Sequence, residues 1–410
     1  MEAVRGVSAS ALRTYSKAAV APAWIIAMNF VSPSPRPGPK RLLIVFGTRP
    51  EALKCFPVAR AAMRHPGFVT EICVTAQHRE MVDKVIALTG MSVDYDLNVM
   101  TAGQTLFDVT TRVLAGMEQV LERARPDIVM VQGDTSTAMA AALAAFYKQI
   151  PVAHIEAGLR SHNINSPFPE ELNRLVVGNI ASWHFAPTTE ARDNLVAEGK
   201  DPSRIFVTGN TVIDTLLHFS NAMEHDAGLS RSLAAPFGFL DPTKKLILVT
   251  SHRRENFDGG IERICRALKV LAARGDVQIV YPVHPNPNVR NVVLAELGSV
   301  PNVHLIDPQD YLPFLYLQKR SYLVMTDSGG VQEEAPSLGK PVLVMRENTE
   351  RPEGVAAGTA RLVGSDVDRI ISTASHLLDD PAAYRGMAEQ HNPYGDGHAS
   401  AHILEELSHA

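Results

Sequence analysis

The fold is decided by the stretch Tyr322-Leu323-Val324-Met325-Thr326-Asp327-Ser328-Gly329-Gly330-Val331-Gln332-Glu333-Glu334. The apolar residues 322–325 predict a buried strand, and the residues that follow the two glycines predict a helix that closes near Gly339. A strand that runs through a short polar turn into a helix is the repeating unit of an α/β fold.

The turn itself indicates a ligand. Ser328, Gly329 and Gly330 allow backbone N–H groups to approach a phosphate, with the positive end of a helix dipole behind them. Glu334 follows about one helical turn later, where its carboxylate can accept ribose hydroxyls. An ordinary strand-to-helix turn explains these residues equally well on their own. The turn is therefore a candidate nucleotide-diphosphate site that needs support from the rest of the chain.

Length and composition narrow the class of protein. The 410 residues exceed the usual domain size of about 100–200 residues and predict two domains. A hydrophobic content of 45% and a charged content of 20% are typical of soluble globular proteins. A net charge of −5 without a dense Lys/Arg cluster argues against a nucleic-acid partner. Only three cysteines are present, which favours a reducing cytoplasm over a disulfide framework.

The first 40 residues differ from the rest of the chain. Their apolar patch from Ala18 to Val31 is interrupted by Pro22 and is shorter than the ~20 residues that cross a membrane. Pro-rich sequence follows in place of a small-residue cleavage site. We expect residues 1–40 to be a flexible extension outside the fold, or translation to start at Met28, with no membrane association.

Two series of strands alternate with helical patterns. The expected strands are 42–46, 72–75, 127–131, 152–155 and 184–186 in the first series, and 246–250, 277–283, 303–306, 322–325 and 342–345 in the second. This alternation predicts an α/β protein with two doubly wound, Rossmann-like domains facing across a cleft. We place them at residues 41–211 and 212–395.

Polar, charged loops follow many of these strands, and ligands bind at the carboxyl ends of strands in open α/β sheets. Arg49 and Lys54 after the first strand, and Arg351 in the second half, are candidates for diphosphate or sugar binding. Considered one at a time, these cations are better explained as solvated residues on helix surfaces.

Carboxylates in these loops suggest acid/base chemistry. Asp134, Glu156 and Glu170 each follow a strand or lie in a Pro-bounded loop. Convergent carboxylates suit general acid/base catalysis, because crowding raises some of their pKa values into a useful range. Helix capping or pairing with an arginine is the alternative for each one. His252 is expected to be catalytic or to contact phosphate, whereas His284 is as readily structural.

Several motifs are absent from the sequence. No strand is followed by G-x-G-x-x-G, and neither a Walker-type phosphate loop nor a G-x-S-x-G elbow is present. His154-Ile155-Glu156 is too weak a pattern for a metal site. Nicotinamide-dependent hydride transfer, ATP hydrolysis and serine-hydrolase chemistry are therefore disfavoured.

Together the motifs resemble those of the bacterial non-hydrolysing UDP-N-acetylglucosamine 2-epimerases from about Arg41 to the C-terminus. The resemblance is carried by Phe46-Gly47-Thr48-Arg49-Pro50-Glu51-Ala52, Thr75-Ala76-Gln77-His78-Arg79-Glu80-Met81, Gly133-Asp134-Thr135, His154-Ile155-Glu156-Ala157-Gly158-Leu159-Arg160, Pro169-Glu170-Glu171, Gly209-Asn210-Thr211-Val212-Ile213-Asp214, His252-Arg253-Arg254-Glu255, Asp327-Ser328-Gly329-Gly330, Gly339-Lys340-Pro341 and Asn392-Pro393-Tyr394-Gly395-Asp396-Gly397.

The resemblance implies two Rossmann-like domains as in GT-B glycosyltransferases, a C-terminal helix over 396–410 that returns to the first domain, and a cytoplasmic homodimer. It also implies the reversible conversion of UDP-GlcNAc to UDP-ManNAc without a metal or other cofactor, supplying ManNAc units for surface polysaccharides. The residues that match the family's UDP site are Arg49, Lys54, Gln309, Phe314, Ser328, Gly329, Gly330, Glu334 and Arg351. Those that match its catalytic residues are Asp134, Glu156, Glu170 and His252.

A second, activating UDP-GlcNAc binds in some members of the family, and Gln77 and His78 match residues of that allosteric site. This chain departs from the family pattern there, because Gly103 replaces an arginine that helps to form the activator site. Gln132 stands where a histidine commonly precedes Gly-Asp, a change that we expect to be tolerated.

The residues also favour one mechanism. The C2 hydrogen of the sugar is not next to a carbonyl, so epimerisation needs either transient oxidation or elimination of the C1 leaving group. Without a nicotinamide motif, elimination of UDP through 2-acetamidoglucal is favoured. Three alternatives remain at this point: a hydrolysing epimerase, a GT-B glycosyltransferase and a catalytically silent UDP-sugar sensor.

Overall fold

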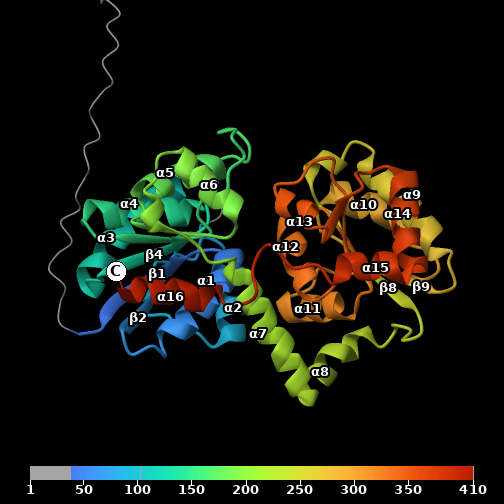
Figure 1. Ribbon diagram of the computed structural model, residues 1–410, viewed down its shortest axis with the longest axis horizontal. Helices are drawn as coiled ribbons and strands as arrows, with labels where there is room; N and C mark the ends of the chain where they lie inside the picture. The colour runs from blue at the N-terminus through green and yellow to red at the C-terminus, as the bar shows by residue number, and fades with distance from the viewer. Residues whose placement is uncertain (1–37, 102, 410) are drawn as a thin grey trace, which may run out of the picture. The chain divides into compact units, whose positions relative to one another are not determined.

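The described part of the chain, residues 38–101 and 103–409 of a computed structural model, contains two parallel β-sheets. The first sheet has the strand order β3-β2-β1-β4-β5-β6-β7, and the second has the order β10-β9-β8-β11-β12-β13. Helices flank both sheets (Figure 1). The predicted α/β class with two doubly wound sheets is confirmed. Most of the predicted N-terminal extension, residues 1–37, lies outside the described residues.

The strands of the first sheet are β1 (Lys40–Phe46), β2 (Phe68–Val74), β3 (Tyr95–Asp96), β4 (Ile128–Gln132), β5 (Val152–Ile155), β6 (Trp183–Ala186) and β7 (Ile205–Val207). Those of the second are β8 (Lys245–Thr250), β9 (Val277–Pro282), β10 (Val303–Ile306), β11 (Leu323–Thr326), β12 (Val342–Val344) and β13 (Ala360–Leu362). All ten expected strands are present, and their first and last residues lie within four positions of the predicted bounds. The sequence prediction missed β3, β7 and β13.

The helices up to the second sheet are α1 (Arg49–Ala62), α2 (Arg79–Thr89), α3 (Leu106–Ala124), α4 (Ser136–Tyr147), α5 (Glu170–Ile180), α6 (Thr189–Ala197), α7 (Thr211–His225) and α8 (Ala227–Ala234). The later helices are α9 (Gly260–Ala272), α10 (Pro287–Leu297), α11 (Tyr311–Arg320), α12 (Gly329–Ser337), α13 (Pro352–Ala356), α14 (Val367–Asp379), α15 (Pro381–Ala388) and α16 (Ala399–His409). Single 3-10 turns are η1 (Pro202–Arg204), η2 (Ala235–Phe237) and η3 (Arg254–Asn256). Within residues 38–101 and 103–409, no helix combines the length and apolar character needed to cross a membrane.

The central strand β1 shows why its sequence forms a buried strand. Leu42, Ile44 and Phe46 pack in a cluster with α1, α2, α7 and α16, whereas Leu43 and Val45 pack on the opposite face with α3 and α4. Side chains alternate between the two faces of a strand, so a strand covered on both sides must be apolar at every position. The unbroken apolar run of β1 meets this requirement.

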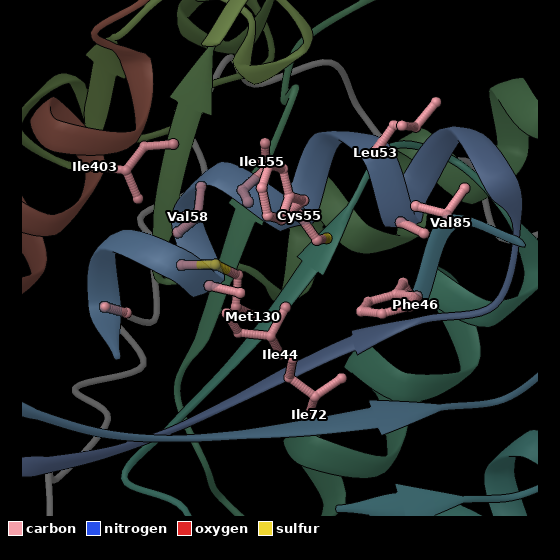
Figure 2. Packing of buried hydrophobic residues seen from close by; sticks show 14 of the residues in the cluster. Ile44, Phe46, Leu53, Cys55, Val58, Ile72, Val85, Met130, Ile155 and Ile403 are labelled. Atoms are coloured by element: carbon pink, nitrogen blue, oxygen red, sulfur yellow. The ribbon is translucent and has the colours of Figure 1, made fainter. Parts of the chain in front are cut away.

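The helix α16 closes the first of these faces. Ile403 of α16 belongs to the same buried cluster as Val58 of α1 and Ile44 of β1 (Figure 2). The amino end of α16 is capped by a residue that is distant in sequence. At its amino end, Asp214 accepts hydrogen bonds from the backbone N–H groups of Ala399 at 3.2 Å and Ser400 at 2.8 Å. A negative charge beside the positive end of the helix dipole is stabilising. Electrostatic attraction as well as packing therefore holds α16 in place.

Two segments that connect the regions of the two sheets lie side by side. The backbone N–H of Asn210, just before α7, donates to the carbonyl of Tyr394 at 2.7 Å. A Cβ atom on Gly209 would lie only 3.1 Å from the Cα of Gly395, and φ of Gly209 is +84°, so glycine is needed here for both space and conformation. The close approach places the Asn210 side chain between the two sheets' loops, where it donates to Glu333 at 2.8 Å.

Two buried histidines on neighbouring strands predict a loss of stability in acid. His154 of β5 and His184 of β6 are adjacent in the sheet, and burial lowers the pKa of His154 to about 4 and that of His184 to about 3. Both rings are neutral when the chain is folded near pH 7. As the pH falls below about 6.5, the unfolded chain takes up protons that the folded chain cannot. We therefore expect the free energy of unfolding to fall by about 1.4 kcal/mol per pH unit for each histidine.

This expectation is tested by urea unfolding between pH 7 and pH 5. His184→Gln should make the dependence on pH shallower than in the unmodified protein, and His402→Gln, at an exposed position of α16, should leave it unchanged. Equal slopes in all three proteins would contradict a role for the buried pair.

Candidate active site

A cavity of about 910 Å³ is lined by the loops that follow β1 and β4 in the first sheet and β8 and β11 in the second. In each sheet these two strands are neighbours at the point where the strand order reverses. Ligands of open α/β sheets bind at the carboxyl ends of the strands at this reversal, where the adjacent loops diverge. The topology of both sheets therefore places one candidate site between their loops.

Nearly all of the predicted site residues line this cavity. Those that do so are Arg49, Lys54, Gln77, His78, Asp134, Glu170, His252, Gln309, Phe314, Ser328, Gly330, Glu334 and Arg351. Glu156 and Gly329 do not belong to its lining. Glu156 pairs with Lys54, and Gly329 lies between Ser328 and Gly330 in the sequence, and these three neighbours do line it.

The turn between β11 and α12 has the conformation of a helix amino terminus. Ser328 is the N-cap of α12, with φ −84° and ψ 129°, and its side chain makes no capping hydrogen bond. A Cβ atom on Gly329 would meet no protein atom closer than 3.9 Å, and one on Gly330 would meet none within 4 Å. The protein's own packing therefore does not require these glycines, whereas the close approach of a phosphate to the backbone would.

Glu156 lies under the cavity in a group of buried charges. Its backbone adopts φ +62°, and its side chain is only 6% exposed. Lys54 donates to both of its carboxylate oxygens at 2.6 and 2.7 Å, Gln132 also donates to it, and Arg351 lies 3.9 Å away. Burial alone would raise the pKa of Glu156, but Lys54 and Arg351 hold it below its ordinary value. Crowding therefore does not raise the pKa of this carboxylate, because cations surround it.

Arg351 joins this group of charges to the second sheet. Its guanidinium forms an ion pair with Glu333 of α12, and Asn210 donates to the same glutamate. Residues from both halves of the chain thus share one buried set of charges. Opposite charges compensate one another there, which is the condition under which buried ions are tolerated.

Asp134 faces the cavity from the loop after β4. Arg174 of α5 pairs with its carboxylate at 2.7 Å, and the amide of Asn173 donates to its backbone oxygen at 2.8 Å. Glu170, the first residue of α5, lies on the same side of the cavity. Arg174 was not among the residues predicted from the sequence. Its spacing of three residues from Glu171, with which it pairs at 3.0 Å, was the available signal.

Glu51 is a second residue that the sequence analysis did not single out. It is fully buried, and its carboxylate accepts hydrogen bonds from the N–H groups of Gly47 and Thr48 and from the hydroxyl of Thr135. Burial raises the pKa of Glu51 to about 7. The carboxyl thereby ties the loop that carries Arg49 to the loop that carries Asp134. The sequence Thr48-x-x-Glu51 is a capping box and could have predicted part of this.

His252 reaches the cavity from the loop after β8. Its ring stacks on that of His284, with centroids 5.4 Å apart and an interplanar angle of 22°. Both histidines line the same cavity as Ser328 and Gly330 at the amino terminus of α12. An imidazole in this place is suited to contact a phosphate or to transfer a proton.

The remaining residues form an apolar and polar pocket beside α11 and α12. Phe314 lines it, and the amide of Gln309 donates to the carbonyl of Asp307 at 2.7 Å. Glu334 accepts a hydrogen bond from Gln318 at 3.3 Å, and burial raises its pKa to about 7. A flat base and a ribose fit such a pocket, because it combines an aromatic face with buried acceptors.

Comparisons with known proteins identify the family of the chain. Residues 60–408 match the family UDP-N-acetylglucosamine 2-epimerase. The chain is 55% identical over 368 residues to the UDP-N-acetylglucosamine 2-epimerase of Escherichia coli (strain K12), covering 90% of this chain and 98% of that protein. A crystal structure of UDP-GlcNAc 2-epimerase from Neisseria meningitidis bound to UDP-GlcNAc superimposes with a TM-score of 0.84 at 48% identity, covering 90% of this chain and 100% of that one. The glycotransferase of kitacinnamycin, at 14% identity, covers 90% of this chain and 99% of its own with a TM-score of 0.59 and shares the fold alone.

Proposed function

This chain belongs to the UDP-N-acetylglucosamine 2-epimerase family and catalyses the reversible epimerisation of UDP-GlcNAc at C2, and we propose that it does so by eliminating and re-adding UDP. The C1–O bond to UDP breaks as the C2 proton leaves, which gives 2-acetamidoglucal and UDP. Protonation of C2 from the opposite face and re-addition of UDP at C1 give UDP-ManNAc. Every atom is recovered, so no oxidant or reductant is needed.

One observation carries this proposal: a single cavity joins the amino terminus of α12 to Asp134 and Glu170 from the other sheet. The diphosphate at α12 is the leaving group, and backbone N–H groups together with the helix dipole stabilise the charge that it gains. Asp134 and Glu170 are then the acid and base that act on the two faces of C2. Holding UDP beside the glucal keeps its re-addition effectively intramolecular.

The buried charges assign different parts to Glu156 and Lys54. Glu156 is ionised and surrounded by cations, so it is a poor proton donor; it acts by holding Lys54 in place at the wall of the cavity. Lys54, Arg49 and Arg351 supply positive charge near the diphosphate, and His252 contacts the same group from the second sheet. The first domain, 41–211, thus carries the chemistry on the sugar. The second, 212–395, binds UDP, and residues 396–410 return to the first.

The uridine half of the substrate occupies the pocket formed by Gln309, Phe314 and Glu334. Glu334→Ala is expected to weaken UDP binding by about 1–3 kcal/mol, the cost of losing a charged hydrogen bond. Because ribose hydroxyls donate to the ionised carboxylate and its pKa is raised to about 7, UDP affinity should fall as the pH drops below about 7. Titration calorimetry at pH 6 and pH 8 checks both expectations. Glu334→Gln should lose this part of the pH dependence; if it keeps the dependence in full, Glu334 does not bind the ribose.

A second UDP-GlcNAc site is a separate part of the proposal. Gln77 and His78 line the cavity next to the loop of Arg49. Gln77 accepts a hydrogen bond from Thr137 at 3.0 Å, so its position is fixed. Initial rates that rise more than linearly with UDP-GlcNAc, and that lose this curvature in Gln77→Ala, would support activation through these residues.

We also propose that the enzyme is a cytoplasmic homodimer without a metal or other cofactor, and that its product supplies ManNAc units for surface polysaccharides. These points rest on membership of the family. The activity itself is tested by proton NMR of the purified protein with UDP-GlcNAc alone. Two interconverting UDP-sugars are expected. Irreversible release of free ManNAc and UDP would instead identify a hydrolysing epimerase, and binding without turnover would identify a sensor.

A further inference from the structure

Asp327 has no part in the mechanism above, yet the loop after β8 is built around it. It is the first residue after β11 and is fully buried at 0% exposure. One carboxylate oxygen, Oδ2, accepts hydrogen bonds from four donors. These are the hydroxyl of Ser251 at 2.8 Å, the N–H groups of His252 at 2.8 Å and Arg253 at 2.9 Å, and the amide of Asn256 at 3.3 Å.

The other oxygen, Oδ1, is the informative one. It is buried and makes no hydrogen bond of good geometry with any described residue. The Nδ1 atom of His252 lies 3.3 Å from it, within reach of a small rotation of the ring. A buried carboxylate oxygen without a donor is costly, so a proton on this Nδ1 would stabilise the arrangement.

The geometry therefore points to a positioning role: we propose that Asp327 accepts a hydrogen bond from Nδ1–H of His252 and thereby stabilises the protonated ring, whose Nε2–H donates to the departing diphosphate. This inference rests on the role proposed above for His252. An imidazole has one donor and one acceptor nitrogen when neutral, and the partner of one nitrogen fixes the state of the other. Carboxylates orient histidines in this way in unrelated active sites.

The charges around His252 leave Asp327 as its one stabilising partner among the groups that shift its pKa. Burial lowers the pKa of His252, and so do the neighbouring Arg253, His284 and Arg346, whereas Asp327 raises it. A positive charge that develops on the imidazole during contact with diphosphate is thus destabilised by these three neighbouring side chains and stabilised by Asp327. The carboxylate of Asp327 therefore does more than accept hydrogen bonds from the loop, because it also stabilises charge on His252.

Asp327→Asn separates this role from that of holding the loop. The amide oxygen of asparagine can still accept from the loop donors, but its NH2 group now faces Nδ1 and requires the other tautomer of His252. We expect kcat to fall by a factor on the order of 10²–10⁴, while the Kd of UDP changes by less than about threefold. In a His252→Gln background, Asp327→Asn should reduce kcat no further, because the two residues act as a unit.

Histidine-selective ¹⁵N labelling supplies a readout that does not depend on activity. Long-range ¹H–¹⁵N spectra, assigned through His252→Gln, should show the proton of His252 on Nδ1 in the unmodified protein and on Nε2 in Asp327→Asn. Asn256→Ala, which removes one donor to Oδ2, should lower the melting temperature but leave the tautomer and kcat essentially unchanged.

Either of two results would overturn the proposal: a His252 tautomer that is the same in both proteins, or rate losses that multiply in the double variant. An unmodified protein that does not epimerise would instead overturn the proposed function, whatever the tautomer of His252.

Discussion

Asp134→Asn is expected to abolish measurable epimerisation while UDP still binds. Asp134 lines the cavity and is held toward it by Arg174 at 2.7 Å, so an asparagine of the same shape would occupy the same place without being able to take up a proton. Loss of a general acid or base reduces kcat by a factor of about 10²–10⁴. The proposed UDP contacts are made by other residues and should be unaffected. Steady-state NMR rates and calorimetric UDP titration measure the two effects separately.

Asp193→Asn, at an exposed position of α6, is the matched control and should retain full activity. Normal turnover in Asp134→Asn would remove Asp134 from the acid/base pair. Loss of UDP binding together with turnover would show that this carboxylate acts on the structure of the cavity and not on the sugar.

Lys54→Met is expected to have the largest effect on stability. It leaves Glu156 ionised and buried, with Arg351 at 3.9 Å as the nearest remaining cation. Removing one partner of a buried ion pair costs about 3–5 kcal/mol, because the other charge is left uncompensated. The urea midpoint should therefore fall markedly, and epimerisation should be lost because positive charge near the diphosphate is removed.

The double variant Lys54→Met with Glu156→Gln tests the cause. Neutralising the glutamate should restore most of the stability but none of the activity. Lys148→Met removes a surface ion pair with Glu118 and Glu122 and should leave the urea midpoint unchanged. If Lys54→Met and Lys148→Met unfold at the same urea concentration, the buried charges do not matter for stability.

The fold was largely predictable because buried parallel strands must be apolar throughout. The apolar runs that form β1 and β12 were placed to within two residues for this reason. The strands that were missed have two or three residues and lie at or near the ends of the sheets' strand orders. A run of this length shows no alternation, and it becomes a strand only because the neighbouring strand offers hydrogen bonds.

The sequence predicted which residues line the cavity but not which of them pair with one another. Loops at the carboxyl ends of parallel strands converge, so motifs in those loops indicate which residues share the cavity. Which residues pair within it depends on the two halves coming together. Glu156 has an αL backbone that turns its side chain toward Lys54, 102 positions away in the sequence. Asp327 belongs to the strand-to-helix stretch at residues 322–334, but its role follows only from its hydrogen bonds to the loop after the neighbouring strand β8.

The central claim is that UDP leaves C1 as the proton leaves C2. It is tested most directly by incubating the purified enzyme with UDP-GlcNAc in D2O, without added cofactor, and observing C2 by NMR. The elimination mechanism predicts that deuterium appears at C2 of both UDP-GlcNAc and UDP-ManNAc as they equilibrate. Interconversion of the two sugars with protium retained at C2 would contradict it.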